Sequence, residues 1–398
     1  MGDDVKLGQA PTTKLQATTA PIKVAIVHDW LVGGGAELVV EQLHKLYPEA
    51  PIYTSYCSRD WRKRLDGKVK TGILQLWPLS RLRKYLPPLR IWWFTHLRLR
   101  GYDLVISSSG AEAKGVKVPA LTVHINYCHA PTHYYWSRYN EYMAHPGFGI
   151  FNWPARLGLK ILVRPLRRWD YKAAQRPDYM IANSNHIKEE IQKYYDRSSA
   201  VVYPPVHTER LKRWATNTQR HGLLIAGRQT PYKRFDLAVA ACTRLGLPLT
   251  VIGDGPEHRH LRKMAGPTII FLGKVSDQVL AEEYGKAQAL IFPGLDDFGI
   301  TPVEAMAAGT PVIAYKGGGA LDYVLPGKTG LFFEEPTVES LVSALQQFPK
   351  QQFNSLAISH AAENFSVARF NQKMRLLVKK ALQIEVRSEA KEKTVNNA

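Results

Sequence analysis

Three acidic side chains gather around a predicted helix start in the second half of the chain. Asp296 and Asp297 lie in a loop that follows an apolar strand. Glu304 lies in the first turn of a helix that is expected to open at Thr301–Pro302 and to end at Gly309. Backbone N–H groups and the helix dipole favour anions at such a terminus. Acids beside an anion site indicate recognition of sugar or ribose hydroxyls next to a phosphate.

Two basic side chains follow another predicted strand, Leu223–Ala226. Arg228 and Lys233 lie in the loop after it, and Thr230–Pro231 opens the next helix. Arginine offers phosphate oxygens a planar fork of donors, and lysine offers a compact positive charge. Because ligands bind beyond the carboxyl ends of parallel strands, these residues predict a diphosphate site, with a generic basic loop as the alternative.

Glycine-rich turns follow several strands and allow a ligand to approach the backbone closely. Gly33–Gly35 comes after the first strand, but Leu38 stands where a dinucleotide fingerprint requires its third glycine. Gly253 and Val275 lie at the ends of two later strands, where a nucleotide base could lie against the backbone. Tight structural turns alone would also account for these glycines.

A histidine follows one strand of the first half. His129 comes just after the predicted strand Thr122–Tyr127 and before a proline-fixed loop, which places its ring at the ligand-binding edge of the sheet. A purely structural histidine is the alternative. His28 and Asp29 end the first strand, and one of them is expected to anchor the Gly33–Gly35 loop.

A divalent metal ion is not expected at this site. The chain has no Asp-x-Asp pair, the usual carboxylate arrangement that holds a divalent ion on a nucleotide diphosphate. Positive side chains and helix dipoles would have to neutralise the leaving group instead.

Short apolar strands alternate with helical patterns along the whole chain, which predicts open parallel α/β sheets. The first half is expected to hold strands at Lys23–His28, Tyr102–Ser107, Thr122–Tyr127 and Asp178–Ala182. The second half is expected to hold strands at Leu223–Ala226, Leu249–Ile252, Ile269–Leu272, Ala289–Phe292 and Val312–Tyr315.

The 398 residues suit two Rossmann-like domains that face a central cleft. Consecutive prolines at Pro204–Pro205 mark the break between them. We expect a first domain over 21–204, a second over 205–365, a C-terminal helix over 366–386 that packs back on the first domain, and disordered tails over 1–20 and 387–398.

The formal net charge of +19 requires an explanation, and nucleic acid and an anionic membrane surface are the two candidate partners. Basic residues interleaved with tryptophan and other aromatics fill residues 71–100 and 148–172. That mixture is typical of peripheral membrane segments. A solvated basic face whose aromatics pack inward is the alternative. The membrane contacts are expected to include Arg81, Arg83, Lys84 and Arg90.

The cysteines and the apolar pattern indicate the compartment. The three cysteines share no metal-ligand or redox spacing, which favours a reducing environment. No apolar run is long enough to span a bilayer, and the first twenty residues lack the apolar core of a signal peptide. We therefore expect a cytoplasmic protein that associates with a membrane at its surface.

Taken in order along the chain, these motifs resemble the retaining family-4 glycosyltransferases of the GT-B fold. The resemblance covers Ile22–Phe370 and rests on Gly33–Glu37, His129 in Cys128–Pro131, Gly227–Arg228 with Lys233, Gly253–Pro256 and the acids Asp296 and Glu304, which seven residues separate. The stretch from Asp297 to Gly309 is most similar to bacterial mannosyltransferases that build polysaccharides and O-antigens on lipid carriers.

The resemblance implies a role for each catalytic candidate. Arg228 and Lys233 would bind the donor diphosphate and stabilise the leaving nucleotide. His129 and Asp296 would lie at the transferred sugar, and Glu304 would hold the ribose hydroxyls. Asp296 stands where the family usually carries glutamate. The remaining donor-binding positions would be Gly34, Gly35, Gly253, Val275, Asp297, Phe298, Gly299, Ile300 and Thr301.

The implied activity is metal-independent, retaining transfer of a hexose, mannose from GDP-mannose, to a lipid-linked or polysaccharide acceptor without any cofactor. No residue in the sequence identifies which nucleotide base the donor carries, so a UDP-hexose donor is the close alternative. A GT-B epimerase is disfavoured by Arg228, Lys233 and the acid pair. A non-enzymatic nucleic-acid-binding protein would also explain the charge, but none of the common recognition motifs is present.

Overall fold

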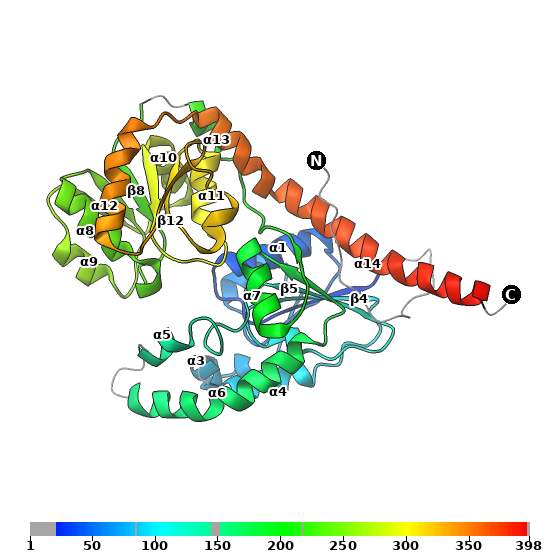
Figure 1. Cartoon of the computed structure of the whole chain (residues 1–398). Helices are drawn as coiled ribbons and strands as arrows, with labels where there is room; N and C mark the ends of the chain where they lie inside the picture. Colours follow the sequence, from blue (N-terminus) through cyan, green and yellow to red (C-terminus); the bar gives the residue numbers. More distant parts are fainter. Residues whose placement is uncertain (1–20, 84–85, 145–151, 217–218, 396–398) are drawn as a thin grey trace. The chain divides into compact units, whose positions relative to one another are not determined.

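The computed structural model describes residues 21–83, 86–144, 152–216 and 219–395, without the side chains of residues 155 and 383–395 (Figure 1). The chain divides into two compact units. The first comprises the residues up to Val202 together with those from Asn371 onward, and the second comprises Tyr203–Phe370. Each unit is built on its own parallel sheet, as the alternating pattern of strands and helices predicts.

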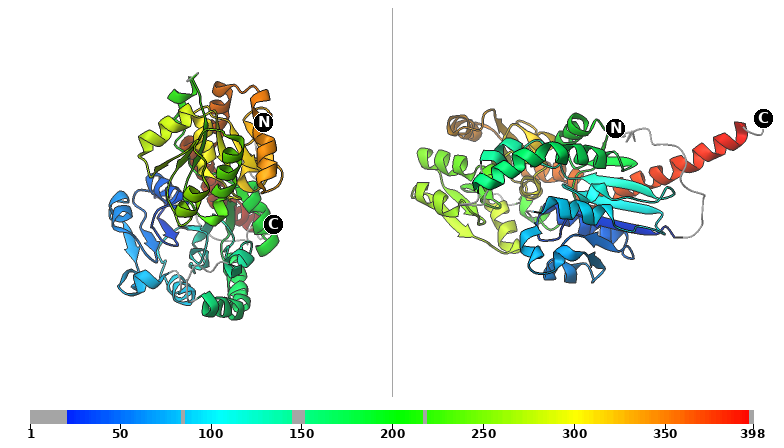
Figure 2. Two further views of the ribbon diagram at one scale, coloured as in Figure 1. Left: turned by 90° about the vertical axis from the view of Figure 1, so that its left-hand side faces the viewer. Right: turned by 90° about the horizontal axis from the view of Figure 1, so that it is seen from below.

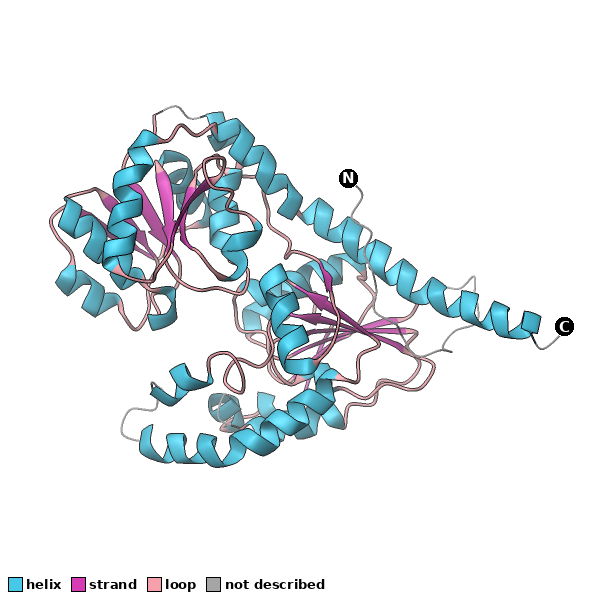
Figure 3. Cartoon of the chain, in the orientation of Figure 1, coloured by secondary structure: helices cyan, strands magenta, loops and turns pink. Residues whose placement is uncertain are grey.

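The first unit has a seven-stranded parallel sheet with the order β3-β2-β1-β4-β5-β6-β7. Helices flank this sheet (Figures 1, 2 and 3). β1, β4, β5 and β6 are buried along their whole length, as parallel strands covered on both faces must be. The strands are β1 (Val24–His28), β2 (Ile52–Thr54), β3 (Val69–Thr71), β4 (Leu104–Ser109), β5 (Val123–Cys128), β6 (Tyr179–Ala182) and β7 (Ala200–Val201).

Several helices of the first unit begin at recognisable caps. Ser58 and Ser184 accept the N–H of the residue three positions later, which starts α2 and α7. The helices are α1 (Gly35–Leu46), α2 (Arg59–Arg64), α3 (Leu79–Leu82), α4 (Pro87–Thr95), α5 (Tyr139–Ala144), α6 (Asn152–Ala174) and α7 (Asn185–Tyr195), with short 3-10 turns η1 (Ile73–Gln75) and η3 (Ala113–Gly115).

The second unit has a six-stranded parallel sheet with the order β10-β9-β8-β11-β12-β13. Its strands are β8 (Leu223–Ala226), β9 (Leu249–Ile252), β10 (Ile269–Gly273), β11 (Ala289–Phe292), β12 (Val312–Tyr315) and β13 (Gly330–Phe333). Ala289 and Ile291 belong to one core cluster, whereas Leu290 and Phe292 belong to another. Successive strand residues point to opposite faces, so the sheet has an apolar core on each side.

Helices and short turns supply the rest of both cores in the second unit. The helices are α8 (Phe235–Leu245), α9 (His258–Met264), α10 (Asp277–Lys286), α11 (Ile300–Ala307), α12 (Val338–Gln347) and α13 (Ser355–Ala362). The 3-10 turns are η5 (Lys212–Thr216), η6 (Pro231–Lys233), η7 (Gly318–Asp322), η8 (Phe348–Lys350) and η9 (Glu363–Phe365). α11 and α13 pack on each other, as do α8 and α12.

The last helix, α14 (Val367–Val395), crosses the division between the two units. Beyond that division, Gln42 of α1 donates to the side-chain oxygen of Asn371 at 2.9 Å, and Met374 and Leu377 are buried. α14 continues past residue 386, where the sequence predicts its end. The tail predicted over 1–20 lies outside the described residues.

All nine predicted strands are present, and those of the first half begin one or two residues later than expected. The prediction missed β2, β3, β7 and β13. β2, β3 and β7 are only two or three residues long, too short to show a pattern, and β13 begins with glycine. Within the described residues, no helix combines the length and the apolarity needed to cross a bilayer.

Candidate functional site

The strand order of the second sheet reverses between β8 and β11, and the loops that follow these two strands meet there. A Cβ atom on Gly294 would lie 2.8 Å from the Cα atom of Lys233. Glycine is therefore needed for the two loops to pack so closely. Such a reversal is where open α/β sheets bind ligands, and it gathers most of the predicted site residues of this unit.

Lys233 and Asp296 form an ion pair across this reversal. Lys233 ends η6, and its ammonium group also lies 5.6 Å from the ring centre of Phe292. Both side chains are mostly buried. The structure thus brings together the predicted phosphate ligand and the predicted sugar ligand, and it pairs them with each other.

A pocket of about 510 Å³ opens at the carboxyl ends of β8, β9 and β10. It is lined by Gly227, Arg228, Gly253, Asp254, Gly255, Pro256 and Lys274. Arg228 and Lys274 are exposed and give the pocket two cations. Sequence reasoning named Arg228 but passed over Lys274, although Lys274 also follows a strand directly.

Packing between loops explains the glycines of this pocket. A Cβ atom on Gly253 would lie 1.9 Å from the carbonyl oxygen of Gly227, and Gly253 has φ +113°. A Cβ atom on Gly255 would lie 2.3 Å from the carbonyl oxygen of Gln229. These contacts favour the tight-turn explanation over one that requires a base to lie against these positions. Val275, half-buried, packs against the core.

Glu304 lies on α11 and is already hydrogen bonded. Arg210 donates to its carboxylate at 3.0 Å and Tyr284 donates at 3.1 Å. Burial raises the pKa of Glu304, although Arg210 opposes the shift. The prediction that Glu304 lies in the first turn is wrong, because α11 begins at Ile300 after Gly299, whose φ is +88°.

The remaining predicted donor residues surround the start of α11. The ring of Phe298 is buried and stacks on Tyr203. Only its backbone can therefore meet a ligand. Four of these residues are half-buried, namely Asp297, Gly299, Ile300 and Thr301. A Cβ atom on Gly299 would lie 2.7 Å from the hydroxyl of Tyr323, so no larger residue fits there without movement.

In the first unit, His129 follows β5 and is half-buried. Its Nε2 atom shares a hydrogen bond of 2.7 Å with the hydroxyl of Ser108, and Asn183 donates to its carbonyl oxygen at 2.8 Å. The ring of Tyr127 lies 5.2 Å away, between ring centres. The imidazole is therefore held in one orientation at the carboxyl edge of the sheet.

The glycine loop after β1 is anchored differently from the prediction. Glu37, rather than His28 or Asp29, accepts the N–H of Gly33 at 2.9 Å. Asp29 instead accepts backbone N–H groups of the loop after β4, at 2.8 Å from Gly110, 3.0 Å from Ala111 and 2.7 Å from Ala113. Gly34 and Gly35 are exposed.

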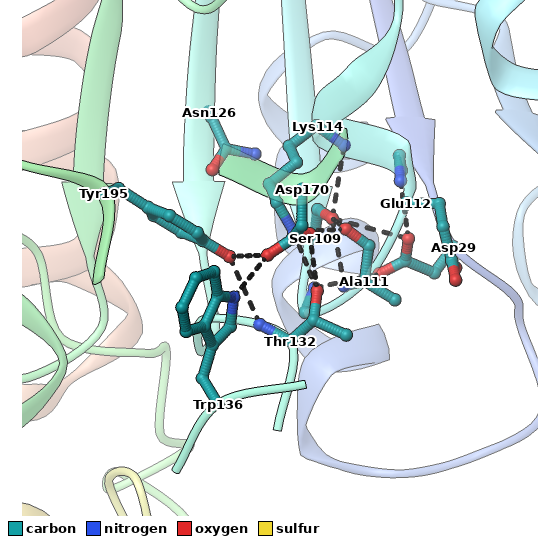
Figure 4. Close-up of polar contacts among 12 residues, drawn as sticks. Asp29, Ser109, Ala111, Glu112, Lys114, Asn126, Thr132, Trp136, Asp170 and Tyr195 are labelled. Atoms are coloured by element: carbon teal, nitrogen blue, oxygen red, sulfur yellow. Dashed lines mark hydrogen bonds and ion pairs between the residues drawn. The ribbon is translucent and has the colours of Figure 1, made fainter. Parts of the chain in front are cut away.

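A buried polar network that includes the loop after His129 was not predicted from the sequence (Figure 4). Lys114 and Asp170 are fully buried and form an ion pair of 2.7 Å. Thr132, Trp136 and Tyr195 each donate to Asp170, at 2.9, 2.7 and 2.7 Å. The network ties the loop after His129 to α6 and α7. No sequence pattern indicates it, because the partners are far apart along the chain.

Arg90 is also part of the interior, which corrects its assignment as a membrane contact. Its guanidinium group makes two hydrogen bonds to Glu112, of 2.9 and 2.8 Å, and both side chains are fully buried. Burial would raise the pKa of Glu112, but Arg90 lowers it below the ordinary value of 4.5. Lys84 lies outside the described residues.

Metal ligands do not gather in either unit. Within the residues that the structure describes, no three side chains of His, Cys, Asp or Glu come together in a way that could hold an ion. The pocket of the second unit is lined by two cations, Arg228 and Lys274, and by one carboxylate, Asp254.

Comparison with known proteins covers both units. Residues 33–210 match the family "Glycosyltransferase Family 4", and residues 206–365 match "Glycosyl transferases group 1". Together the two matches extend over most of the chain, and their junction lies close to the division between the units.

The chain is similar to a GDP-mannose-dependent alpha-mannosyltransferase of Mycolicibacterium smegmatis, at 28% identity over 47% of this chain and 52% of that protein. It thus spans about half the length of that relative. It is also 24% identical to an alpha-1,3/1,6-mannosyltransferase of Schizosaccharomyces pombe, over 78% of this chain and 70% of that protein.

A solved structure supports the fold. Anabaena HepE in complex with UDP matches with a TM-score of 0.66 at 17% identity, over 90% of this chain and all of that one. With the two family matches and the two parallel sheets, this similarity confirms the predicted α/β GT-B fold. The chain therefore belongs to the family-4 glycosyltransferases of the GT-B fold and is similar to mannosyltransferases within that family.

Proposed function

We propose that the chain transfers a hexose from a nucleotide-diphosphate sugar, without a metal ion and with retention of configuration. The observation that carries this proposal is the pocket at the carboxyl ends of β8, β9 and β10, which is lined by two cations and opens from the same loop after β8 that holds Lys233. Cations fixed in a loop stabilise charge as it develops on a leaving diphosphate. Arg228 and Lys274 are the cations that line the pocket.

Two acids of the predicted site, Asp296 and Glu304, each have a cation beside them. Asp296 pairs with Lys233, and Glu304 pairs with Arg210. We infer that the ribose hydroxyls of the donor take over part of the Glu304 carboxylate from Arg210, which is partly exposed and also bonded to Asp277. We infer that the diphosphate similarly draws Lys233 toward itself and leaves Asp296 to accept a hydroxyl of the sugar.

The proposed donor is GDP-mannose, and the proposed acceptor is a lipid-linked or polysaccharide glycan. The donor is supported by the relatives, because one is described as GDP-mannose-dependent and the other as a mannosyltransferase. His129, Gly34 and Gly35 keep their proposed roles at the transferred sugar and the diphosphate. No carboxylate nucleophile is required if the leaving phosphate oxygen deprotonates the acceptor on the same face of the sugar.

Thermal unfolding with a panel of nucleotides tests the donor. A ligand that binds only the folded protein raises its melting temperature, so GDP and GDP-mannose are expected to raise it by several degrees, and UDP, ADP and UDP-hexoses by less. Arg228→Ala should abolish the shift. Arg244→Ala, which changes an exposed arginine of the same unit paired with Glu339, should preserve it.

Two results would change the assignment. A larger shift with UDP-hexoses would move the donor to that class while leaving the transfer reaction in place. The absence of any nucleotide-dependent shift, in a protein with an intact circular dichroism spectrum, would refute the diphosphate site.

A further inference from the structure

An exposed apolar stripe runs along the first half of α6. Trp153, Leu157 and Ile161 are spaced four residues apart, so they lie on one face of the helix, and they are 72%, 45% and 63% exposed. A helix of a globular protein normally turns such a stripe toward a core. α6 instead contributes Val163 and Leu166, from its second half, to the interior.

Exposed cations lie on the same face of α6 as this stripe. Lys160, Arg164 and Arg168 are all exposed, and no acidic residue occurs from 152 to 169. The other arginines of α6 are engaged with the protein. Arg167 donates to the carbonyl oxygen of Tyr135, and Arg156 donates to two carbonyl oxygens at the end of α5.

A second exposed apolar group lies near α3 and α4. Leu76 and Trp77, before α3, and Trp92, on α4, are all exposed. α4 and α6 both pack on the short turn η3. The helices that carry the two apolar groups therefore share a packing partner in the first unit.

We propose that the exposed face of α6 docks on an anionic lipid surface, with the helix lying in the headgroup region. Trp153, Leu157 and Ile161 enter the boundary between headgroups and acyl chains, while Lys160 and Arg164 remain at the phosphates. Amphipathic helices with large apolar side chains and flanking cations bind in this way. The inference does not depend on the proposed transfer reaction.

The charge and the side-chain types favour lipid over other occupants. Large aliphatic side chains gain nothing from a nucleic-acid backbone, to which binding is mainly electrostatic. A second copy of the same face would bring like charges together and is disfavoured for that reason. An anionic bilayer offers phosphate groups to the cations and an apolar interior to the stripe.

Flotation of the full chain with vesicles tests the proposal. Vesicles of phosphatidylglycerol and phosphatidylcholine in equal parts should carry the protein upward, and vesicles of phosphatidylcholine alone should carry at least about tenfold less. A triple variant, Trp153→Ser with Leu157→Ser and Ile161→Ser, should lose most of the binding to the mixed vesicles. A matched control replaces exposed apolar residues elsewhere, by Leu121→Ser, Ile270→Ser and Leu356→Ser, and should bind as the wild type does.

A second variant separates charge from apolar contact. Lys160→Gln with Arg164→Gln and Arg168→Gln should weaken binding to the mixed vesicles on the order of a hundredfold. Lys63→Gln with Lys117→Gln and Lys350→Gln removes the same charge from exposed sites outside α6 and should weaken binding much less. All variants change exposed side chains, so their melting temperatures should match the wild type.

Three outcomes would overturn the proposal. The first is unchanged flotation in the apolar variant. The second is loss of flotation in the apolar control to the same extent as in the α6 variant. The third is binding to duplex DNA, but not to vesicles, that the α6 charge variant abolishes, which would assign this face of α6 to nucleic acid.

Discussion

The two sheets carry charged side chains at the same kind of edge, but these side chains are buried in the first unit and partly exposed in the second. In the first unit, the pair Lys114 and Asp170 is fully buried and surrounded by hydrogen-bond donors (Figure 4). In the second unit, the pair Lys233 and Asp296 keeps some exposure, and Arg228 of the same loop as Lys233 lines an open pocket. Both edges lie beyond the carboxyl ends of parallel strands, so topology alone does not distinguish them.

The difference lies in what each charge can still bind. Burial would lower the pKa of Lys114, but Asp170 raises it, and the net shift is upward. That ammonium is satisfied inside the protein and serves to hold the loop after His129. Arg228 and Lys274, by contrast, face solvent at the pocket. The edge of the first sheet is structural because its charges are paired inside the protein, whereas the edge of the second sheet can bind a ligand because its cations face solvent. Mutations should therefore affect stability at the first edge and activity at the second.

The largest effect is expected from a substitution at the buried pair of the first unit, Lys114 and Asp170. Asp170→Asn removes the ion-pair partner of the buried Lys114, which should lower the free energy of unfolding by about 3–5 kcal/mol. Urea unfolding followed by tryptophan fluorescence measures it well, because every tryptophan except Trp214 lies in the first unit. Glu339→Gln, in an exposed pair with Arg244, should cost less than about 1 kcal/mol. Equal effects of the two changes would contradict the structural role.

The next largest effect is expected from a substitution at the pocket of the second unit, which should lower activity without lowering the stability of the fold. Arg228→Ala should lower kcat/KM for the sugar donor by about 10²–10³-fold, the usual loss when a group that stabilises developing charge is removed. The side chain is exposed, so the free energy of unfolding should change by less than about 1 kcal/mol. Steady-state kinetics and urea unfolding of the same preparation measure both. Retained activity would remove Arg228 from the diphosphate site.

The sequence predicts the residues at the edge of the second sheet, but not the buried ion pair at the edge of the first, and the reason is physical. Arg228 and Lys233 directly follow a strand, and Glu304 lies on the next helix after β11, so local order along the chain places them. Lys114 and Asp170 meet only through the sheet order and the packing of α6 on η3, which no local pattern contains. The pairing of Arg210 with Glu304 was missed for the same reason.

A pH dependence of opposite sign should sharpen the comparison. The pKa of Glu112 is lowered by Arg90 and that of Glu304 is raised by burial, each from an ordinary value of 4.5. Glu112 therefore stabilises the protein above pH 4.5, and this contribution is lost as the pH falls through its lowered pKa. The contribution of Glu304 is full below pH 4.5 and is lost as the pH rises through its raised pKa.

The measurement compares each glutamine variant with the wild type by urea unfolding at several pH values. On acidification, the wild type should lose stability relative to Glu112→Gln and gain stability relative to Glu304→Gln. Parallel pH profiles for the two variants would show that the two carboxyl groups do not differ as the structure indicates.

The smallest expected effect decides which neighbouring acid serves the donor sugar. Asp296→Asn removes the charge that pairs with Lys233, and a hydrogen bond to a charged group contributes about 1.5–3 kcal/mol. This variant should therefore lower kcat/KM by about tenfold or more. Asp297→Asn should stay within about threefold of the wild type, because the ion pair with Lys233 at the reversal of the sheet is made by Asp296. The opposite ranking in steady-state kinetics would transfer the role of the family's glutamate to Asp297 and leave Asp296 as a structural partner of Lys233.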